Sequence, residues 1–108
     1  MFYNYVSCSV YLDRRVFTVG EPVYITLVNL GNAPVRVGSW GVIDEVGRVI
    51  YLVEPPQIII SPNSSFVVIW FQLDNEGKQV GRGRFRVLWR PLVNGNVIEC
   101  LSDVFEIS

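Results

Sequence analysis

The chain has 108 residues, a formal net charge of −1, no histidine, and hydrophobic residues at half of its positions. This length predicts one domain, residues 1–108, and the near-neutral charge gives no electrostatic reason to expect nucleic acid as a partner. The uncharged apolar runs are far shorter than the ~20 residues of a membrane-spanning helix, so no membrane insertion is expected. Eight of the nine basic residues are arginine, a bias consistent with codon usage or with a thermophile.

The chain order indicates strands throughout and no helix. Glycine and proline recur every few residues, and the segments between them are short and rich in Val, Ile, Tyr, Phe and Trp. This pattern is typical of an all-β sandwich or barrel. The seven predicted strands cover residues 5–12 (continued by 16–17), 23–29, 35–40, 48–53, 65–73, 84–92 and 96–107, with a short extended piece at 58–60. The last strand is expected to bulge near Leu101 and Ser102, where its alternation changes phase.

Strands 49–53 and 65–73 are apolar on both faces. Such a strand is either covered on both sides or presents an interface. We therefore predict Phe66, Val68 and Trp70, which share one face of strand 65–73, as candidates for contact with a protein partner or for self-association, such as a homodimer. The alternative is that the loop at 54–63 folds over this strand.

The arginines of strand 84–92 form a stripe at alternate positions. A polyanion could use such a stripe, but aromatic side chains are not interleaved with it, which disfavours nucleic acid. Cross-strand ion pairs with the acidic residues of the next strand are the favoured interpretation. The residues concerned are Arg82, Arg84, Arg86 and Arg90 on one side and Glu99, Asp103 and Glu106 on the other.

No catalytic or metal site is predicted, and no cofactor. The chain lacks histidine for general base catalysis, a Gly-x-Ser-x-Gly elbow, paired carboxylates and a CxxC pattern, so we do not expect an enzyme. The oxygen-rich turn at 74–77 could hold calcium, but a hairpin turn capped by Asp74 is the favoured interpretation. Cys8 and Cys100 are either two free buried thiols or a disulfide.

Two segments resemble a prokaryotic immunoglobulin-like domain. The first is G-E-x-V-x-I-x-L-x-N-x-G, from Gly20 to Gly31, and the second is W-x-x-x-D-x-x-G-x-x-V-x-x-G-x-[FY]-x-V, from Trp70 to Val87. The second segment is similar to a signature shared by intracellular proteinase inhibitor domains and by the immunoglobulin-like part of flagellar hook-cap proteins. Phe85 stands where that family usually has tyrosine, and the Cys…Trp…Cys arrangement of antibody domains is absent.

The resemblance implies an immunoglobulin-like β-sandwich of about seven antiparallel strands in two sheets. It also implies that the first and last strands, which carry Cys8 and Cys100, are neighbours, which strengthens the case for a disulfide, while two free buried thiols stay the favoured interpretation. The implied function is a non-enzymatic protein-interaction domain. An inhibitor would need an exposed and rigid loop, for which the best candidate is Glu54-Pro55-Pro56-Gln57. The alternative is a structural domain of a cell-surface or filament assembly. The domain is expected in the cytoplasm if the chain is complete, and outside the cell if it is excised from a larger protein.

Overall fold

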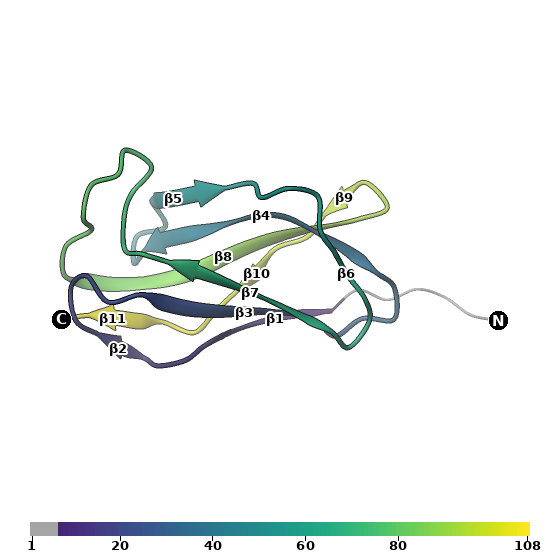
Figure 1. Ribbon diagram of the computed structural model, residues 1–108, viewed down its shortest axis with the longest axis horizontal. Helices are drawn as coiled ribbons and strands as arrows, with labels where there is room; N and C mark the ends of the chain where they lie inside the picture. Colours follow the sequence, from purple (N-terminus) through teal and green to yellow (C-terminus); the bar gives the residue numbers. More distant parts are fainter. Residues whose placement is uncertain (1–6) are drawn as a thin grey trace.

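The computed structural model describes residues 7–108, and over this range the chain forms two β-sheets packed face to face (Figure 1). The start of the predicted strand 5–12 therefore lies outside the described residues. No helix occurs from residue 7 onward, so none there could cross a membrane.

The smaller sheet has three antiparallel strands in the order β1-β3-β7. They are β1 (Cys8–Leu12), β3 (Val23–Asn29) and β7 (Ser65–Trp70). The predicted alternation is confirmed in β3, where Val23, Ile25 and Leu27 are fully buried. In the view of Figure 1 this sheet lies in front of the larger one.

The larger sheet has the order β2-β11-β8-β4-β5, with three short strands at its margins. β6 pairs with β4, whereas β9 and β10 pair with β8, and the one parallel pairing among the described strands joins β2 to β11. The strands are β2 (Val16–Phe17), β4 (Val35–Asp44), β5 (Val49–Val53), β6 (Ile59–Ile60), β8 (Gly83–Val93), β9 (Asn96–Val97), β10 (Cys100–Leu101) and β11 (Phe105–Ile107). The predicted all-β, immunoglobulin-like sandwich is confirmed, although the first and last predicted strands are divided into shorter pieces.

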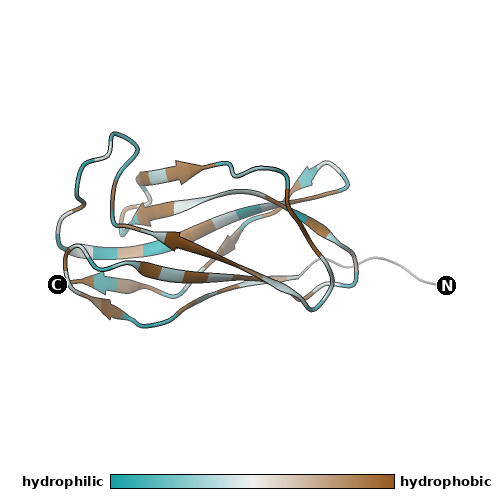
Figure 2. Cartoon of the chain, viewed as in Figure 1, coloured by the Kyte–Doolittle hydropathy of each residue, from teal (hydrophilic) through white to brown (hydrophobic). Residues whose placement is uncertain are grey.

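An aromatic cluster fills one end of the core between the sheets. The ring of Trp70 lies 6.3 Å from that of Phe85 and 6.2 Å from that of Phe105, both edge-on, an arrangement that aromatic pairs prefer. The indole N–H of Trp70 donates to the carbonyl of Leu73 at 2.9 Å, so the one polar atom of this buried ring is satisfied. The hydropathy colouring in Figure 2 shows β7 as apolar along most of its length.

Two strands end at other residues than the sequence predicted, namely β4 and β7. β4 continues past Trp40 to Asp44, because Gly41 lets the backbone of β5 approach closely at Tyr51. β7 ends at Trp70, because Gln72 adopts a positive φ of 59° and turns the chain.

The predicted irregularity near Leu101 and Ser102 is confirmed. The chain leaves the ladder after β10, and the buried Ser102 accepts a hydrogen bond from the Val87 amide through Oγ at 2.8 Å. The Ser102 amide in turn donates to the Val87 carbonyl at 3.0 Å. This side-chain contact replaces part of the strand pairing between β8 and the end of the chain.

Candidate interaction surface

The smaller sheet is uncharged on the surface that it turns away from the core. β1, β3 and β7 contain no Asp, Glu, Lys or Arg at any position. The side chains opposite to the buried ones form what we call the outer face, and Phe71 continues it just past β7. The outer face consists of Ser9, Tyr11, Tyr24, Thr26, Val28, Ser65, Val67, Ile69 and Phe71.

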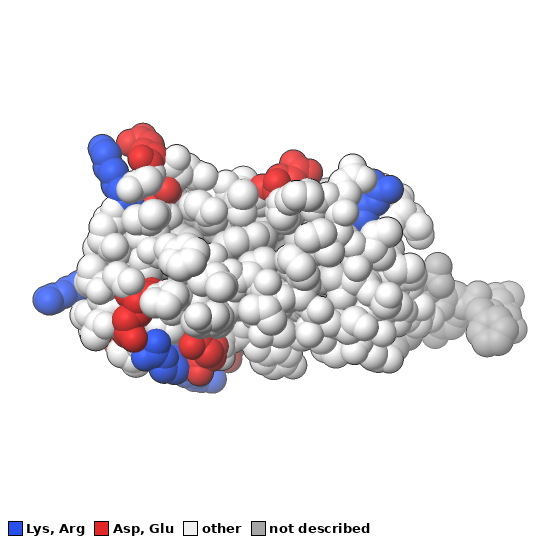
Figure 3. Space-filling model, in the orientation of Figure 1, with Lys and Arg blue, Asp and Glu red and all other residues white. Residues whose placement is uncertain are grey.

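Strand register makes the outer face one continuous patch. Thr26 lies at its centre, because it pairs with Tyr11 on β1 and with Val67 on β7. The five large side chains are 55% (Tyr11), 46% (Tyr24), 53% (Val67), 38% (Ile69) and 60% (Phe71) exposed. Figure 3 shows that this side of the molecule is uncharged over its centre, with charged side chains towards the margins. Contiguous exposed apolar surface of this kind marks interaction sites in proteins.

The larger sheet differs, because charged side chains lie among its exposed apolar ones, such as Ile59 and Leu101. Its outer surface carries exposed charged side chains on β4, β8 and β11, including Arg36, Arg84, Arg86 and Glu106. Polar and charged side chains of this kind are typical of a sheet face that is exposed to solvent. The contrast therefore assigns the water-facing role to the larger sheet and leaves the outer face of the smaller sheet as the candidate interaction surface.

The structure corrects the prediction that Phe66, Val68 and Trp70 form the interface. Val68 and Trp70 are buried at 9% and 1% exposure, and Phe66 is half-buried against the core. The exposed side of β7 is the alternate set of Val67 and Ile69. The loop at 54–63 does not cover that set, since its segment β6 pairs with β4 and the Ile58 carbonyl accepts from the Val37 amide at 2.9 Å.

The outer edge of β7 has no strand partner among the described residues. The Asn29 amide donates to the Ser64 carbonyl at 3.0 Å, and antiparallel bonding alternates along the ladder. Hence Ser65, Val67 and Ile69 turn their N–H and C=O groups away from β3. By contrast, the edge of β5 is closed, because the Asn75 side chain donates to the Leu52 carbonyl at 2.8 Å and accepts from the Leu52 amide at 2.9 Å.

The loop Glu54-Pro55-Pro56-Gln57 leads from β5 toward β6. Glu54, Pro56 and Gln57 are exposed and Pro55 is half-buried. These four residues form no hydrogen bond with any other described residue. An inhibitory role for this loop therefore remains a prediction that rests on its exposure and its two prolines.

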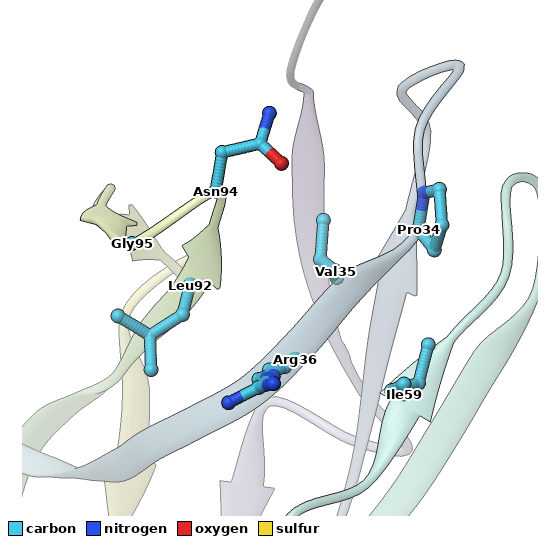
Figure 4. Close-up of a pocket in the computed structure, with 7 residues that line it drawn as sticks. All are labelled: Pro34, Val35, Arg36, Ile59, Leu92, Asn94 and Gly95. Atoms are coloured by element: carbon cyan, nitrogen blue, oxygen red, sulfur yellow. The ribbon is translucent and has the colours of Figure 1, made fainter.

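A shallow groove of about 340 Å³ lies beside the start of β4 (Figure 4). Arg36 crosses it between Ile59 of β6 and Leu92 of β8, its neighbours in register. The other lining residues are Pro34, Val35, Asn94 and Gly95. Arg36 and Asn94 are the two polar side chains of this lining, which are fewer convergent polar groups than a specific small-molecule site needs.

The arginine stripe pairs with acidic residues only in part. Arg90 binds Glu99 at 3.1 Å, as predicted. Asp103 binds Arg15 instead, also at 3.1 Å, because β10 ends before Asp103 can lie beside β8. Arg84 is opposite Glu106 in register, but these two residues form no ion pair, and neither Arg82 nor Arg86 has one with any described residue.

Cys8 and Cys100 form a disulfide that joins β1 to β10. Their Cα atoms are 6.2 Å apart, within the range that a disulfide spans. The structure therefore has the bridged form, not the two free thiols that the sequence favoured. The bridge connects the smaller sheet to the larger one at the edge opposite to β7.

The oxygen-rich turn at 74–77 is a structural turn, as favoured from the sequence. One carboxylate oxygen of Asp74 accepts the amides of Glu76 and Lys78, both at 2.9 Å, and Gly77 has a φ of 79°. Asp44 makes the same pair of bonds to Val46 and Arg48 in the β4–β5 turn. No group of three His, Cys, Asp or Glu side chains lies together within residues 7–108.

One carboxyl in this range has a clearly shifted pKa. The Thr18 hydroxyl donates to Glu21 Oε1 at 2.7 Å, and the Thr18 amide donates to the same atom at 2.6 Å. With Arg14 bound to Oε2 at 2.9 Å, these bonds lower the pKa of Glu21 to about 2. The carboxylate stabilises the turn before β3, so the Gly-Glu pair of the first resemblance segment has a structural role.

Sequence reasoning missed the outer-face residues of β1 and β3. Tyr11, Tyr24 and Thr26 alternate with buried residues, as the polar side of any exposed strand does. The signal that distinguishes them is the absence of charge from three strands that are far apart in sequence. Only the strand order β1-β3-β7 shows that those strands share one surface.

Comparisons with known proteins show the fold. No protein-family model matches the chain, and no curated protein matches it in sequence. The chain is similar to the crystal structure of a CARDB domain from Pyrococcus furiosus in complex with di-metal ions, with a TM-score of 0.54 and 15% identity over 98% of this chain and 88% of that one. It is also similar to part of the Pseudomonas fluorescens alkylpurine DNA glycosylase AlkC bound to DNA, with a TM-score of 0.51 and 17% identity over 94% of this chain and 30% of that one. The chain therefore has the immunoglobulin-like β-sandwich fold of the CARDB structure.

Proposed function

We propose that this domain is a non-enzymatic protein-interaction module that binds its partner through the outer face of the smaller sheet. The observation that carries the proposal is the complete absence of charged residues from β1, β3 and β7, beside a larger sheet on which charged side chains lie among the exposed apolar ones. Covering each large apolar side chain of the outer face is worth roughly 1–2 kcal/mol, so a matching protein surface gains affinity there.

Site-specific photo-crosslinking in the native cell tests this proposal. A photo-reactive amino acid at Thr26, the centre of the outer face, is expected to form a covalent adduct with a protein. The matched control carries the same group at Val46, an exposed apolar residue of the β4–β5 turn that lies outside the outer face. Adducts at both positions, or at neither, contradict a specific outer-face interaction.

The disulfide favours a second candidate, a structural domain of a cell-surface or filament assembly. Disulfides persist mainly in oxidising compartments, although proteins of hyperthermophiles are an exception, and Cys8–Cys100 joins the two sheets. Fractionation of the native cell, with the redox state of both cysteines measured by thiol alkylation, separates the two candidates. Oxidised protein in the envelope fraction favours assembly, and protein in the cytosolic fraction contradicts it.

A likeness to intracellular proteinase inhibitors would give the interaction a definite target. Its support is the exposed loop Glu54-Pro55-Pro56-Gln57 together with the second resemblance segment. A panel of purified serine proteases is the test, with a variant in which Pro55 and Pro56 are replaced by glycine as the control for loop rigidity. Lack of inhibition across the panel removes this likeness and leaves the outer-face proposal intact.

A further inference from the structure

We propose that the partner on the outer face is a second copy of this chain, packed sheet against sheet as a two-fold symmetric dimer. This inference rests on the proposed function, because it names the occupant of the same surface. It is argued from charge, area and the arrangement of large and small side chains.

The charge distribution favours a copy of the same surface. A partner chosen by ion pairs would meet complementary charges at this site, and the outer face contains none. Two copies of an uncharged surface come together without burying an unpaired charge, which would be strongly destabilising. The hydroxyl groups of Tyr11, Tyr24 and Thr26 can act as both donor and acceptor, so identical groups on two copies can satisfy one another.

The area is sufficient for a dimer. With five large side chains between 38% and 60% exposed, the outer face offers on the order of 600 Å² per copy. The pair would bury about 1,200 Å², the lower limit for specific interfaces of standard size. We therefore expect a dimer that dissociates on dilution, rather than an obligate one.

The arrangement of side chains is self-complementary. The tyrosines lie toward β1 and β3, and the aliphatic side chains Val67 and Ile69 lie on β7. A two-fold axis along the central strand β3 sets β1 of one copy against β7 of the other. Tyr11 then meets the smaller Val67 twice, once on each side of the axis, so that large and small side chains interdigitate there as they do between packed sheets, while Tyr24 and Thr26 of β3 meet their own counterparts.

Sedimentation equilibrium of the full chain tests the inference. We expect the wild type to be a dimer at high concentration and a monomer on dilution. Tyr11→Lys and Tyr24→Lys each bury a charge within the contact and are expected to raise the dimer dissociation constant about 100-fold or more. Val46→Lys adds the same charge outside the outer face and is expected to leave dimerisation unchanged. Circular dichroism melting checks that each variant is folded.

The free edge of β7 provides the competing geometry. Val67→Pro removes an outward amide that β3 does not use, and proline is tolerated on edge strands, so face-to-face packing predicts a smaller effect than that of Tyr24→Lys. A dimer lost with Val67→Pro but kept with both lysine variants overturns the inference in favour of edge pairing. A wild type that stays monomeric at millimolar concentration also overturns it. If the Thr26 crosslink then captures a different protein, the proposed function stands and only the second copy is rejected.

Discussion

Gln72 is a buried side chain whose polar atoms are all bonded. Its amide nitrogen donates to the carbonyls of Thr18 and Glu21, both at 2.9 Å, and its oxygen accepts from the Gly20 amide at 2.9 Å. Gln72 thus ties the turn before β3 to the loop after β7, and because these two strands are antiparallel both segments lie at the same end of the outer face. Asn29, also fully buried, ties the next loop in the same way, with its side-chain amide donating to the carbonyls of Ala33 and Ile60.

Replacing Gln72 by leucine is expected to lower the free energy of unfolding by about 2–4 kcal/mol, because the part-buried hydrogen bonds of the Gln72 side chain to the Gly20 amide and to the Thr18 and Glu21 carbonyls are lost. Urea denaturation measures this change. Gln79→Leu is the control, since Gln79 is exposed and contributes one bond of 3.1 Å to Gln72, so its effect should stay within about 0.5 kcal/mol. Equal losses of unfolding free energy for the two substitutions would show that burial of the Gln72 amide does not contribute to stability.

Glu21 predicts a pH dependence of stability. Hydrogen bonds from Thr18, supported by Arg14, lower the pKa of Glu21 from 4.5 to about 2 in the folded state. The contribution of the carboxylate to stability is therefore fully present above pH 4.5 and is lost as the pH falls from about 4.5 toward 2. We expect the difference in unfolding free energy between wild type and Glu21→Gln to shrink over that interval. A difference that is constant from pH 7 to pH 2 would contradict the lowered pKa.

At the scale of the elements, the contact between β4 and β5 depends on the absence of a side chain at Gly41. A Cβ atom at this position would overlap the Tyr51 carbonyl of the neighbouring strand, and backbone atoms cannot move aside as side chains can. Gly41→Ala is therefore expected to destabilise the domain by about 3 kcal/mol or more, measured by chemical denaturation.

Gly47→Ala is the control for that prediction. Gly47 has a φ of 86° and nothing near its would-be Cβ, so alanine there incurs only the backbone penalty of about 1–2 kcal/mol. If alanine lowers the unfolding free energy equally at Gly47 and at Gly41, the close approach of β5 to β4 is not the reason for the effect at Gly41.

The sequence predicted the elements well where local chemistry decides them. Alternation located β3 and the inward set Phe85, Val87 and Trp89, and the Asp-x-x-Gly pattern located the turn at 74–77. It could not decide which side of β7 is exposed, because both sides are apolar and a strand does not reveal its own partners. That choice depends on β7 pairing with β3 in a register that places Val68 opposite Ile25 in the core.

At the scale of the whole molecule, the two sheets divide the surface between them. The larger sheet carries the exposed arginines of β4 and β8 and keeps one side of the molecule in water. The smaller sheet carries none, so its outer face is suited to a contact that excludes water. This division needs the two sheets to keep their relative position, which the aromatic core secures at one end and the disulfide secures at the edge opposite to β7.

The disulfide gives the last prediction at this scale. Cys8 and Cys100 are 92 residues apart in sequence, and closing so long a loop is worth about 4–5 kcal/mol in the chain-entropy model, with 2–4 kcal/mol typical of measured bridges. The double variant Cys8→Ser with Cys100→Ser is expected to have an unfolding free energy about 2–4 kcal/mol lower than the wild type in urea denaturation. Because the chain has only two cysteines, a reducing agent should lower the stability of the wild type and leave the double variant unchanged. If reduction does not change the wild-type midpoint, the link between β1 and β10 is not what holds the sheets together, and strand pairing together with the aromatic core must suffice.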